Sequence, residues 1–573
     1  MFYKTRQDIM PNYKIHIENR YESWKVYTDD TLNEIEYKIE PIKEKLFSDD
    51  IFNDDNGVIS IVHSTIKQCK SMPGVLMLEK NKTYGKKKNK FLYKCIPDDN
   101  RMPIFLLPYE IKFLGFSKKM ENKYVTFNYE NWMGQHPQGL LSNVIGDVTK
   151  LENFYEYQLF CKSLNASIQN FSRHTAKVLK EKTEEEFIHI IMDKYPTIED
   201  RTETHDIFSI DPNGCGDFDD AFSITKLEDD QVKISIYISN VSIWLDVLNL
   251  WESFSDRVAT IYLPDRKRPM LPTCLSECLC SLQENRLRVA FNVDFTIDKN
   301  YDIINVEYHN TLVKLKKNFI YEEKALLKYD NYILMKDVVD KLSKKYKYIH
   351  NCNTSHDLVA YLMVLMNCYC SKEMIKDKNG IYRSVLINKT VSLPSDLPDD
   401  VSKFLTIWNS SSGQYMLHSD ELKHEILNMD NYIHMTSPIR RLVDLLNMIR
   451  FQQNLQMITL SNSAQEFYDK WINKLSYINI TMRAIRKVQC DCNLLHYYTT
   501  NETILQEKYK GYVFDKLKRN DGLYQYIVYL PELKLTSRIT LRDDNENYSY
   551  CYFKLYMFMD ESKIKRKIRL MVV

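Results

Sequence analysis

Four aspartates lie close together in the stretch IDPNGCGDFDDA: Asp211, Asp217, Asp219 and Asp220. The segments on either side, IFSI and AFSI, are typical of buried β-strands. The carboxylates are therefore expected to lie against an apolar core, where an unpaired charge costs on the order of several kcal/mol. A divalent cation with oxygen ligands is the simplest group that would neutralise them.

Two cations are compatible with this cluster. Asp211, Asp217 and Asp219 fit the spacing of an EF-hand calcium loop, but Phe222 stands where that loop needs its glutamate. A calcium-stabilised structural module therefore remains the alternative. Mg²⁺ keeps open positions for water and phosphate, so a few carboxylates suffice and others stay free to orient an attacking water. This arrangement favours metal-assisted phosphoryl chemistry.

A second stretch, NYIHMTSPIRRLVDLLNMIRF at 431–451, contains a predicted anion site. Ser437 suits a helix N-cap and Pro438 the first helical position, which places Arg440 in the first turn. Arginine beside the free N–H groups of a helix start favours binding of a phosphate. The alternative is a surface arginine paired with Asp444, a pair that contributes little. Beside a metal cluster, the phosphate-binding interpretation is preferred.

Several motifs in order resemble the RNase II / RNase R family of 3′→5′ exoribonucleases, in its eukaryotic or large-virus form. SIDPNGCGDFDDA resembles the family's I-D-P followed by D-x-D-D, and YLPDRKRPMLPTCLSECLCSL its Y-L-P…L-C-S-L signature. NFIYEEK resembles the family's tyrosine segment, GIYRSV its arginine-bearing strand, and HMTSPIRRLVDLL its T-S-P-I-R-R motif. The resemblance extends over roughly residues 200–495.

The resemblance implies a Mg²⁺-dependent, processive exoribonuclease that hydrolyses single-stranded RNA to nucleoside 5′-monophosphates, with Mn²⁺ as a second usable cation. It implies the following roles: Asp211, Asp217 and Asp220 hold the metal, Asp219 is most needed for cleavage, Tyr321 contacts the terminal nucleotide, and Arg440 stabilises charge on the scissile phosphate. Tyr262, Arg383 and Arg441 are further assigned to RNA binding.

Some positions depart from the family pattern. Ala360 and Tyr361 stand where the family has paired glutamates that position the 3′-terminal nucleotide. Asp357 lies one helical turn earlier and is a candidate substitute. Asn240 replaces a usual aspartate, and Leu442 a usual tyrosine. These departures leave a cleavage-poor RNA-binding homologue as an alternative function.

The fold class expected is multidomain α+β, with a mixed α/β RNB catalytic core flanked by OB-type β-barrels. The expected parts are an N-terminal extension at 1–57, a cold-shock-type OB barrel region at 58–165, a helical connector at 166–199, the RNB domain at 200–495 and a C-terminal OB-type barrel at 496–573. Short apolar runs between turns predict the barrels. A helix interrupted by Pro41 is predicted over TLNEIEYKIEPIKEKLF.

Two basic stretches are candidates for binding single-stranded RNA. In KTYGKKKNKFLYK, lysines alternate with aromatic residues, a pattern that suits phosphate contacts combined with base stacking. In KIKRKIRL, the period of two places basic residues on one face of a strand. The candidates are Lys86, Lys87, Lys88, Phe91, Tyr93, Lys563, Lys565, Lys567 and Arg569.

The composition of the 573 residues bounds the remaining possibilities. The net charge is +1, so a nucleic-acid surface must be local. Thirteen scattered cysteines suit free thiols in a reducing compartment, without a disulfide-linked partner. The start, MFYKTRQDIMPNYKIH, lacks the apolar run of a signal peptide, and LVAYLMVLMNCYCS predicts a buried helix too short to span a membrane. We expect a cytoplasmic or nuclear protein.

Overall fold

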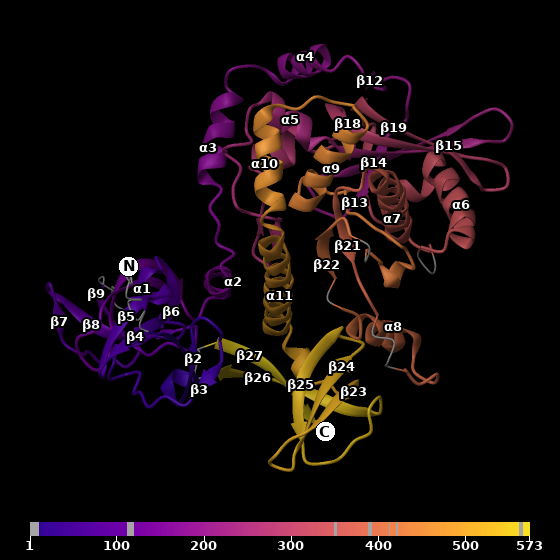
Figure 1. Cartoon of the computed structure of the whole chain (residues 1–573). Coiled ribbons are helices and arrows are strands. Elements are labelled where there is room, and N and C mark those ends of the chain that lie inside the picture. The colour runs from indigo at the N-terminus through magenta and orange to yellow at the C-terminus, as the bar shows by residue number, and fades with distance from the viewer. Residues whose placement is uncertain are drawn as a thin grey trace, which may run out of the picture. The chain divides into compact units, whose positions relative to one another are not determined.

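The computed structural model describes residues 11–111, 120–348, 352–387, 392–411, 413–419, 422–560 and 565–573. The chain forms two compact units, one of Met1–Asn165 with Cys490–Val573 and the other of Ala166–Gln489 (Figure 1). The first unit is built from three β-sheets, whereas the second combines a large sheet with helices. The fold is therefore multidomain α+β.

The first sheet contains β1 (Asn12–Glu18), β2 (Ser23–Thr28), β3 (Glu34–Ile35), β4 (Ile51–Asp55) and β5 (Val58–His63), in the order β3-β2-β1-β4-β5. The helix predicted over residues 31–47 is wrong, because this segment holds β3 and turns at Pro41 instead. The turns bury Leu46 and Phe47 completely, in an apolar core that residues of the first and second sheets share. A boundary at residue 57 is also wrong, because it would divide the hairpin of β4 and β5.

The second sheet contains β6 (Met72–Leu76), β7 (Lys86–Lys87), β8 (Lys90–Pro97), β9 (Phe105–Tyr109), β10 (Lys123–Asn131) and β11 (Gln138–Asp147). Strand β6 pairs with both β10 and β8, which closes β6, β10, β11, β9 and β8 into a barrel. The short helix α1 (Thr65–Gln68) precedes this sheet and α2 (Leu151–Cys161) follows it. Stacking of Tyr124 on Tyr157, with ring centroids 4.2 Å apart, packs α2 against β10.

The C-terminal sheet contains β23 (Tyr509–Lys518), β24 (Tyr524–Leu530), β25 (Leu535–Leu541), β26 (Tyr550–Asp560) and β27 (Lys565–Val572). Its order is β25-β24-β23-β26-β27. Apolar side chains such as Val513, Val528 and Phe553 are fully buried inside it. On β26, Tyr550, Tyr552 and Tyr556 are exposed on the outer face, as the period of two requires.

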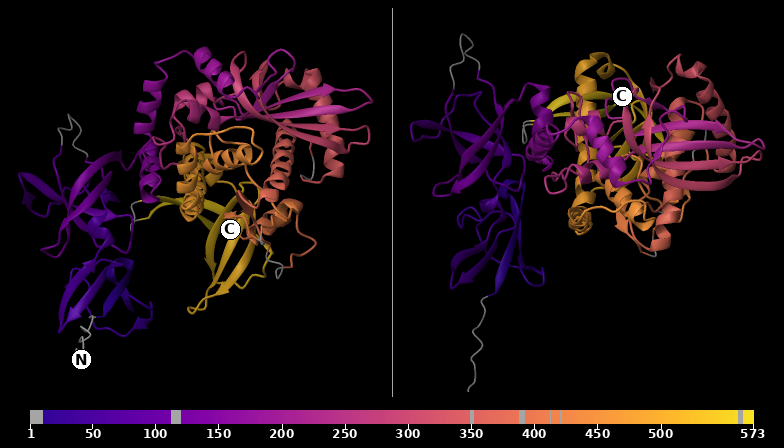
Figure 2. Two further views of the ribbon diagram at one scale, coloured as in Figure 1. Left: turned by 45° about the horizontal axis from the view of Figure 1, so that its top comes forward. Right: turned by 90° about the horizontal axis from the view of Figure 1, so that it is seen from above.

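The second unit is organised around a seven-stranded sheet, in the order β12-β19-β18-β15-β14-β13-β20. Its strands are β12 (Glu199–Asp200), β13 (Phe208–Asp211), β14 (Asp220–Lys226), β15 (Val232–Ser239), β18 (Leu287–Ile297), β19 (Ile303–Lys314) and β20 (Lys317–Ile320). Ile234, Ile236 and Ile238 of β15 are fully buried, and the period of two places them on one face of the strand. Helices α6 (Asp330–Lys345) and α7 (Ser355–Met374) share its apolar core (Figure 2).

The other helices of this unit are α3 (Gln169–Val178), α4 (Glu184–Lys194), α5 (Val241–Val247), α8 (Asp399–Trp408), α9 (Leu442–Asn454), α10 (Asn462–Ile472) and α11 (Leu475–Thr500). The last of these continues beyond the unit boundary. Two small antiparallel strand pairs complete the unit: a hairpin of β16 (Ile261–Tyr262) with β17 (Lys267–Arg268), and a two-stranded sheet of β21 (Ile381–Ser384) with β22 (Gln414–Leu417).

Helix α7 is longer than the sequence predicted. Among the described residues, Ser355–Asp377 is the one helical segment with the length and apolar composition of a membrane span, and 61 % of its apolar window is buried within the structure. Its burial among β-strands and α6 is that of a core helix. All thirteen cysteines are free thiols.

Candidate active site

The acidic motif lies at one edge of the central sheet. Strand β13 ends at Asp211 and β14 begins at Asp220, and the connecting loop carries Asp217 and Asp219. An EF-hand holds its loop between two helices, whereas this loop joins two strands, so the EF-hand interpretation is wrong. A pocket of about 850 Å³ opens here, and its lining includes Asp211, Asp217, Asp219, Asp220, Tyr262, Tyr321, Arg440 and Arg441.

Asp217 is held by the β16–β17 hairpin. Tyr262 and Lys267 are register partners in that hairpin. The Tyr262 hydroxyl donates to Oδ2 of Asp217 at 3.2 Å, and Lys267 Nζ donates to Oδ1 at 2.8 Å. Lys267 also forms an ion pair with Glu277 at 2.6 Å. Lys267 and Glu277 were not predicted, although the run of basic residues in YLPDRKRPM was a signal for the former.

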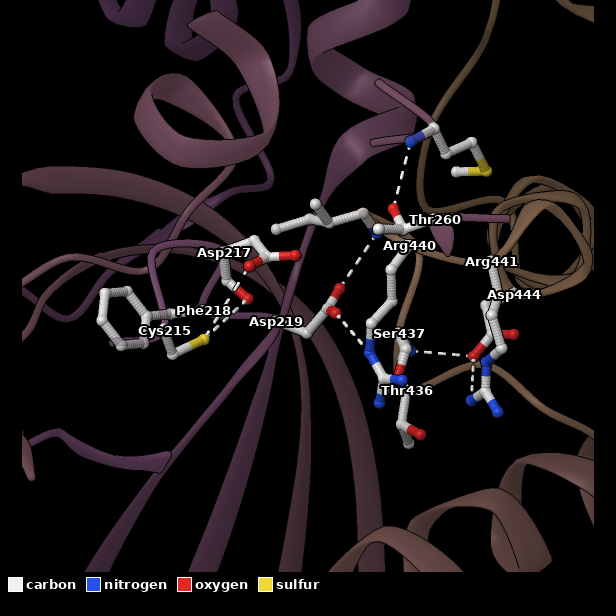
Figure 3. Close-up of polar contacts among 12 residues, drawn as sticks. Cys215, Asp217, Phe218, Asp219, Thr260, Thr436, Ser437, Arg440, Arg441 and Asp444 are labelled. Atoms are coloured by element: carbon white, nitrogen blue, oxygen red, sulfur yellow. Dashed lines mark hydrogen bonds and ion pairs between the residues drawn. The ribbon is translucent and has the colours of Figure 1, made fainter. Parts of the chain in front are cut away.

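Both carboxylate oxygens of Asp219 accept hydrogen bonds. The backbone N–H of Ile439 donates to Oδ1 at 2.9 Å, and Arg440 Nε donates to Oδ2 at 3.2 Å (Figure 3). The side chain is 3 % exposed, and burial raises the pKa of Asp219 to about 7. Asp219 is thus joined directly to the predicted phosphate-binding arginine.

Asp211 and Asp220 have no cationic hydrogen-bond partner among the residues that the structure describes. Ser209 Oγ donates to Oδ2 of Asp211 at 2.8 Å, and burial raises the pKa of Asp211 to about 6. Burial also raises the pKa of Asp220 well above its usual value. Its buried Oδ2 atom has no hydrogen-bond partner within the described part of the chain. Buried carboxylates with an unsatisfied oxygen fit a hard divalent cation, which prefers oxygen ligands.

A second group of potential metal ligands is more closely spaced than the aspartates of the pocket. Within the described ranges, Asp294, Glu307 and His309 form the one set of three potential metal ligands whose atoms all lie within 4.8 Å. Arg201 donates to Asp294 at 2.8 Å and 3.1 Å, so a guanidinium already supplies the positive charge there. We assign this group to an ion-pair network. The carboxylate oxygens of the predicted ligands Asp211, Asp217 and Asp220 do not all lie within 4.8 Å of one another. Asp217 is also hydrogen-bonded to Lys267.

Arg440 lies in a turn before α9, and its predicted place in the first helical turn is wrong. Helix α9 begins at Leu442. The turn forms because the buried carboxylate of Asp444 accepts from the N–H of Ser437 and from Arg441 Nη2, each at 2.8 Å. Ser437 Oγ accepts from Arg440 Nη2 at 3.0 Å and does not cap the helix. Asp444 therefore pairs with Arg441, whereas Arg440 pairs with Asp219.

The remaining predicted residues of this unit divide into two groups. The N–H of Tyr321 donates to the Asp211 carbonyl at 3.1 Å, which fixes Tyr321 at the pocket. Arg441 also lines the pocket. Arg383 does not line it: its guanidinium lies 5.1 Å from the Tyr415 ring, and burial lowers its pKa. Arg383 is therefore outside the pocket lining, and its assignment to RNA binding stays a prediction.

The RNB domain model matches residues 200–332, which include the four aspartates and Tyr321. The chain contains an RNB domain. The probable exosome complex exonuclease RRP44 of Caenorhabditis elegans is 36 % identical over 118 residues, 20 % of this chain and 12 % of that protein. Ribonuclease R of Buchnera aphidicola is 27 % identical over 334 residues, 44 % of this chain and 46 % of that protein. The matches thus span less than half of each relative.

Solved structures share the fold over nearly the whole chain. Apo RNase R of Mycoplasma genitalium superposes with a TM-score of 0.70 at 15 % identity, over 98 % of this chain and 100 % of that one. Yeast Ssd1, described as a pseudonuclease, superposes with a TM-score of 0.61 at 12 % identity, over 95 % and 80 %. At these identities the likeness shows the fold and nothing about activity.

The departures near the RNB domain have local explanations. Ala360 lines the pocket, whereas Tyr361 is buried on another face of α7 and its hydroxyl donates to the Tyr346 carbonyl at 3.1 Å. Asp357 accepts from the N–H groups of Thr354 and Asn353 at 2.9 and 3.2 Å, and so caps the start of α7. Asp357 is thus not a substitute for the missing glutamates.

Asn240 belongs to a buried amide network beside the RNB sheet. Its Nδ2 donates to Oδ1 of Asn310 at 2.8 Å and to Oε1 of Gln452 at 2.9 Å. Its Oδ1 accepts from the N–H of Ile243 at 3.3 Å and caps α5. An ionised aspartate has no donor for the two amide oxygens, so asparagine suits this network.

The lysine-rich hairpin of the second barrel exposes some of the residues that were predicted to bind RNA, and buries others. Phe91 is 42 % exposed, and Lys86 Nζ lies 4.6 Å from its ring centroid. Lys87 forms an ion pair with Glu130, and Lys88 lies in the turn with a φ of 43°. Tyr93 is 1 % exposed, so its predicted stacking on a base is wrong: it faces the barrel core.

The C-terminal strand β27 is confirmed over the described residues, Lys565–Val572. Arg569 is exposed, with its guanidinium 5.9 Å from the Phe558 ring, whereas Lys567 forms an ion pair with Asp560. Lys563 and the side chain of Lys565 lie outside the described residues.

Proposed function

We propose that the protein is a Mg²⁺-dependent 3′→5′ exoribonuclease that degrades single-stranded RNA processively to nucleoside 5′-monophosphates. The observation that carries this proposal is one pocket that holds four carboxylates together with Arg440. An acidic group with an unsatisfied buried oxygen attracts a cation, and an arginine beside it attracts a phosphate. The RNB domain, a relative named as an exonuclease and another named as a ribonuclease support the reaction.

The proposed roles follow from the contacts. Asp211, Asp217 and Asp220 would hold Mg²⁺, or Mn²⁺ in its place. When bound, the cation neutralises charge and polarises a phosphoryl oxygen. Asp219 would orient the attacking water, and Arg440 would stabilise the charge that develops on the phosphate. Arg440 is suited to this because, among the described contacts, its Nη1 has no hydrogen-bond partner.

The proposed reaction is the hydrolysis of one phosphodiester bond, with water as the only other reactant. The oxygen of water forms a bond to phosphorus, and the bond between phosphorus and the 3′-oxygen of the penultimate nucleotide breaks. The shortened RNA leaves with a 3′-hydroxyl, and the terminal residue leaves as a 5′-monophosphate. Tyr321 would contact that terminal residue, as its place beside Asp211 allows.

The barrels would bind the RNA upstream of the cleaved end. Exposed basic and aromatic side chains at Lys86, Phe91 and Arg569 suit phosphate contacts and base stacking. We further propose a reducing location, the cytoplasm or the nucleus, on the basis of the thirteen free thiols.

A paired measurement with Asp219→Asn tests the proposal. Single-turnover release of 5′-monophosphate from a single-stranded RNA should require Mg²⁺, stop with EDTA, and fall by ~10²–10⁴ in the variant. Binding of the same RNA, measured on a filter, should survive because one negative charge near the phosphate is removed. Hydrolysis by the variant at the wild-type rate would contradict the role of Asp219.

A second candidate function is RNA binding with little cleavage. The observation in its favour is that α7 brings Ala360 to the pocket and no carboxylate. Ssd1, which shares the fold, is described as a pseudonuclease. The same assay separates the two candidates: tight RNA binding, with hydrolysis no faster than that of Asp219→Asn, would support this second function.

A further inference from the structure

A second pocket lies in the first sheet, in the compact unit that does not carry the acidic site. Its volume is about 560 Å³. Its walls come from β2, from the chain between β3 and β4, and from the β4–β5 hairpin. We call it the first-sheet pocket, and its lining includes Trp24, Tyr37, Ile39, Glu44, Asp54 and Ile59.

Two carboxylates of the first-sheet pocket, those of Asp54 and Glu44, form no ion pair with a basic side chain of the described residues. Asp54 is held in place, because its Oδ1 accepts from the Gly57 N–H at 2.6 Å and its Oδ2 accepts from the Tyr37 hydroxyl. Burial, the hydrogen bond to Asp54 and the charges of Asp54 and Glu44 together raise the pKa of Tyr37 above its ordinary value. Both carboxylates thus act on the same part of the pocket, and their negative charge favours a cationic ligand.

The two lysines of the lining do not neutralise these carboxylates. Lys43 forms an ion pair with Glu40 at 3.5 Å. Lys38 is exposed and forms no ion pair with Asp54 or Glu44. Three carboxylates and two ammonium groups in the lining leave one negative charge in excess.

The remainder of the first-sheet pocket is aromatic and aliphatic. Trp24 is 37 % exposed, and Ile39 and Ile59 are partly buried. A guanidinium stacks on an indole ring and pairs with a carboxylate through its planar fork, while the aliphatic stem of the same side chain packs on apolar groups. The combination of indole, carboxylates and isoleucines therefore fits an arginine side chain.

Strand β5 offers a free edge beside this pocket. It is the last strand in the order of the first sheet, and among the described strands it pairs with β4 alone. Val58 and Val62 of β5 are 66 % and 54 % exposed, and Ile59 between them lines the pocket. An exposed apolar edge strand is a template for pairing with another extended chain. A peptide paired with β5 would bring one of its side chains to the pocket.

We propose that the first-sheet pocket binds an arginine side chain of a partner protein, in an extended segment that pairs with the free edge of β5. The occupant is a peptide and not RNA, because Asp54 and Glu44 attract a guanidinium and repel a phosphate. The inference does not depend on the proposed exoribonuclease function, since no residue of the acidic site takes part in it.

The first test is a selection from a displayed library of random peptides of nine residues on the full-length protein. The same selection on Trp24→Ala protein identifies the peptides that need the pocket. Peptides enriched on the wild-type protein alone should share an arginine, with apolar or β-branched residues at alternate positions around it. Enrichment without arginine, or no enrichment over Trp24→Ala, overturns the inference.

Affinities of one enriched peptide, measured by fluorescence anisotropy, test which groups carry the binding. Replacement of its arginine by citrulline, which keeps the shape and removes the charge, should weaken binding by about tenfold or more. Trp24→Ala should weaken it by about 3- to 30-fold, and Glu44→Gln by about three- to fivefold. Glu36→Gln is the matched control, because Glu36 is exposed and lies outside the pocket lining.

Thermal melting shows whether the Trp24→Ala protein is folded, and Glu44→Gln tests the pocket independently of that variant. Equal affinities for the arginine and citrulline peptides, or equal effects of Glu44→Gln and Glu36→Gln, contradict the inference.

Two further measurements exclude other occupants of the pocket. Affinity for a single-stranded RNA, measured on Asp219→Asn protein with and without Trp24→Ala, should agree within about twofold, because the indole is assigned to a peptide. A fall in RNA affinity as large as that for the peptide would place a base on Trp24 and overturn the inference. Sedimentation should give the same mass for the wild type and Glu44→Gln. A dimer that Glu44→Gln converts to monomers would make a second copy of this chain the occupant, and this also overturns the inference.

Discussion

At the scale of single residues, the candidate site combines carboxylates that lack sufficient counter-charge. The pKa of Asp211 is raised to about 6 and that of Asp219 to about 7, in both cases mainly by burial. A folded state that raises the pKa of a carboxyl binds its proton more tightly than the unfolded state does. The contribution of these groups to stability is therefore present at low pH and is lost as the pH rises through the folded pKa values.

Asp220→Asn should stabilise the metal-free protein and remove its response to Mg²⁺. Oδ2 of Asp220 is buried without a hydrogen-bond partner among the described residues, and burial raises its pKa. Removal of this charge should raise the free energy of unfolding by about 1–3 kcal/mol at pH 8 in EDTA. Thermal melting with and without Mg²⁺ measures both effects. Asp229→Asn, at an exposed turn, is the control and should change neither.

Lys267 should weaken the affinity of the pocket for a divalent cation, because its ammonium group already donates a hydrogen bond to the carboxylate of Asp217. Lys267→Met is expected to tighten binding of Mn²⁺, measured by titration calorimetry. Glu277→Gln should have the opposite effect, since Lys267 would lose its second partner and remain with Asp217. Weaker binding in Lys267→Met would mean that the lysine positions Asp217 for the metal and does not compete with it.

At the scale of elements, the turn before α9 determines where Arg440 points. Asp444 is fully buried in α9 and fixes the turn through the N–H of Ser437, while Arg440 reaches back to Asp219. Strand ends, a hairpin and a turn thus each supply one part of the pocket. None of these elements is long, so the site depends on the packing of the unit as a whole.

Arg440→Lys should lower turnover more than RNA affinity. The guanidinium uses Nε for Asp219 and Nη2 for Ser437, and a lysine ammonium cannot make both bonds in this geometry while it also contacts a phosphate. Loss of one such donor costs about 10²–10³ in rate. Single-turnover cleavage and filter binding measure the two quantities. An equal fall in both would make Arg440 a general RNA anchor.

At the scale of the whole molecule, the barrels of the first unit carry the basic and aromatic surface, and the second unit carries the pocket. Affinity for a nucleic acid is distributed over many phosphate contacts, whereas hydrolysis depends on a few side chains. Changes in the barrels should therefore alter binding and its salt dependence and leave the cleavage step of bound RNA unchanged.

Lys86 and Lys87 are neighbours on one hairpin and form a matched pair for testing this. Lys86 is exposed above Phe91, whereas Lys87 is paired with Glu130. Lys86→Ala should reduce the slope of log K against log salt concentration by about 0.7 on single-stranded RNA. Lys87→Ala should leave the slope unchanged. An unchanged slope in Lys86→Ala would show that this hairpin does not contact phosphate.

The sequence alone determined the features that depend on short spacing. The runs IFSI and AFSI predicted two buried strands, and the aspartate spacing predicted an acidic cluster at a strand end. These patterns involve residues a few positions apart, whose relative placement a strand or turn largely decides. The four aspartates, Tyr262, Tyr321, Arg440 and Arg441 were found from the sequence and line the pocket, whereas Lys267, His434 and Thr436 also line it and were not predicted as site residues.

Only the tertiary structure decided how the predicted residues are paired. Asp219 meets Arg440 across a separation of 221 residues, and Lys267 meets Asp217 across 50. Tyr93 proved to be buried, because closure of its barrel and not the local pattern of lysines decides which face it turns inward. Such contacts form when distant segments pack into one core. The local propensity of a segment for helix or strand does not determine which distant segment it will contact.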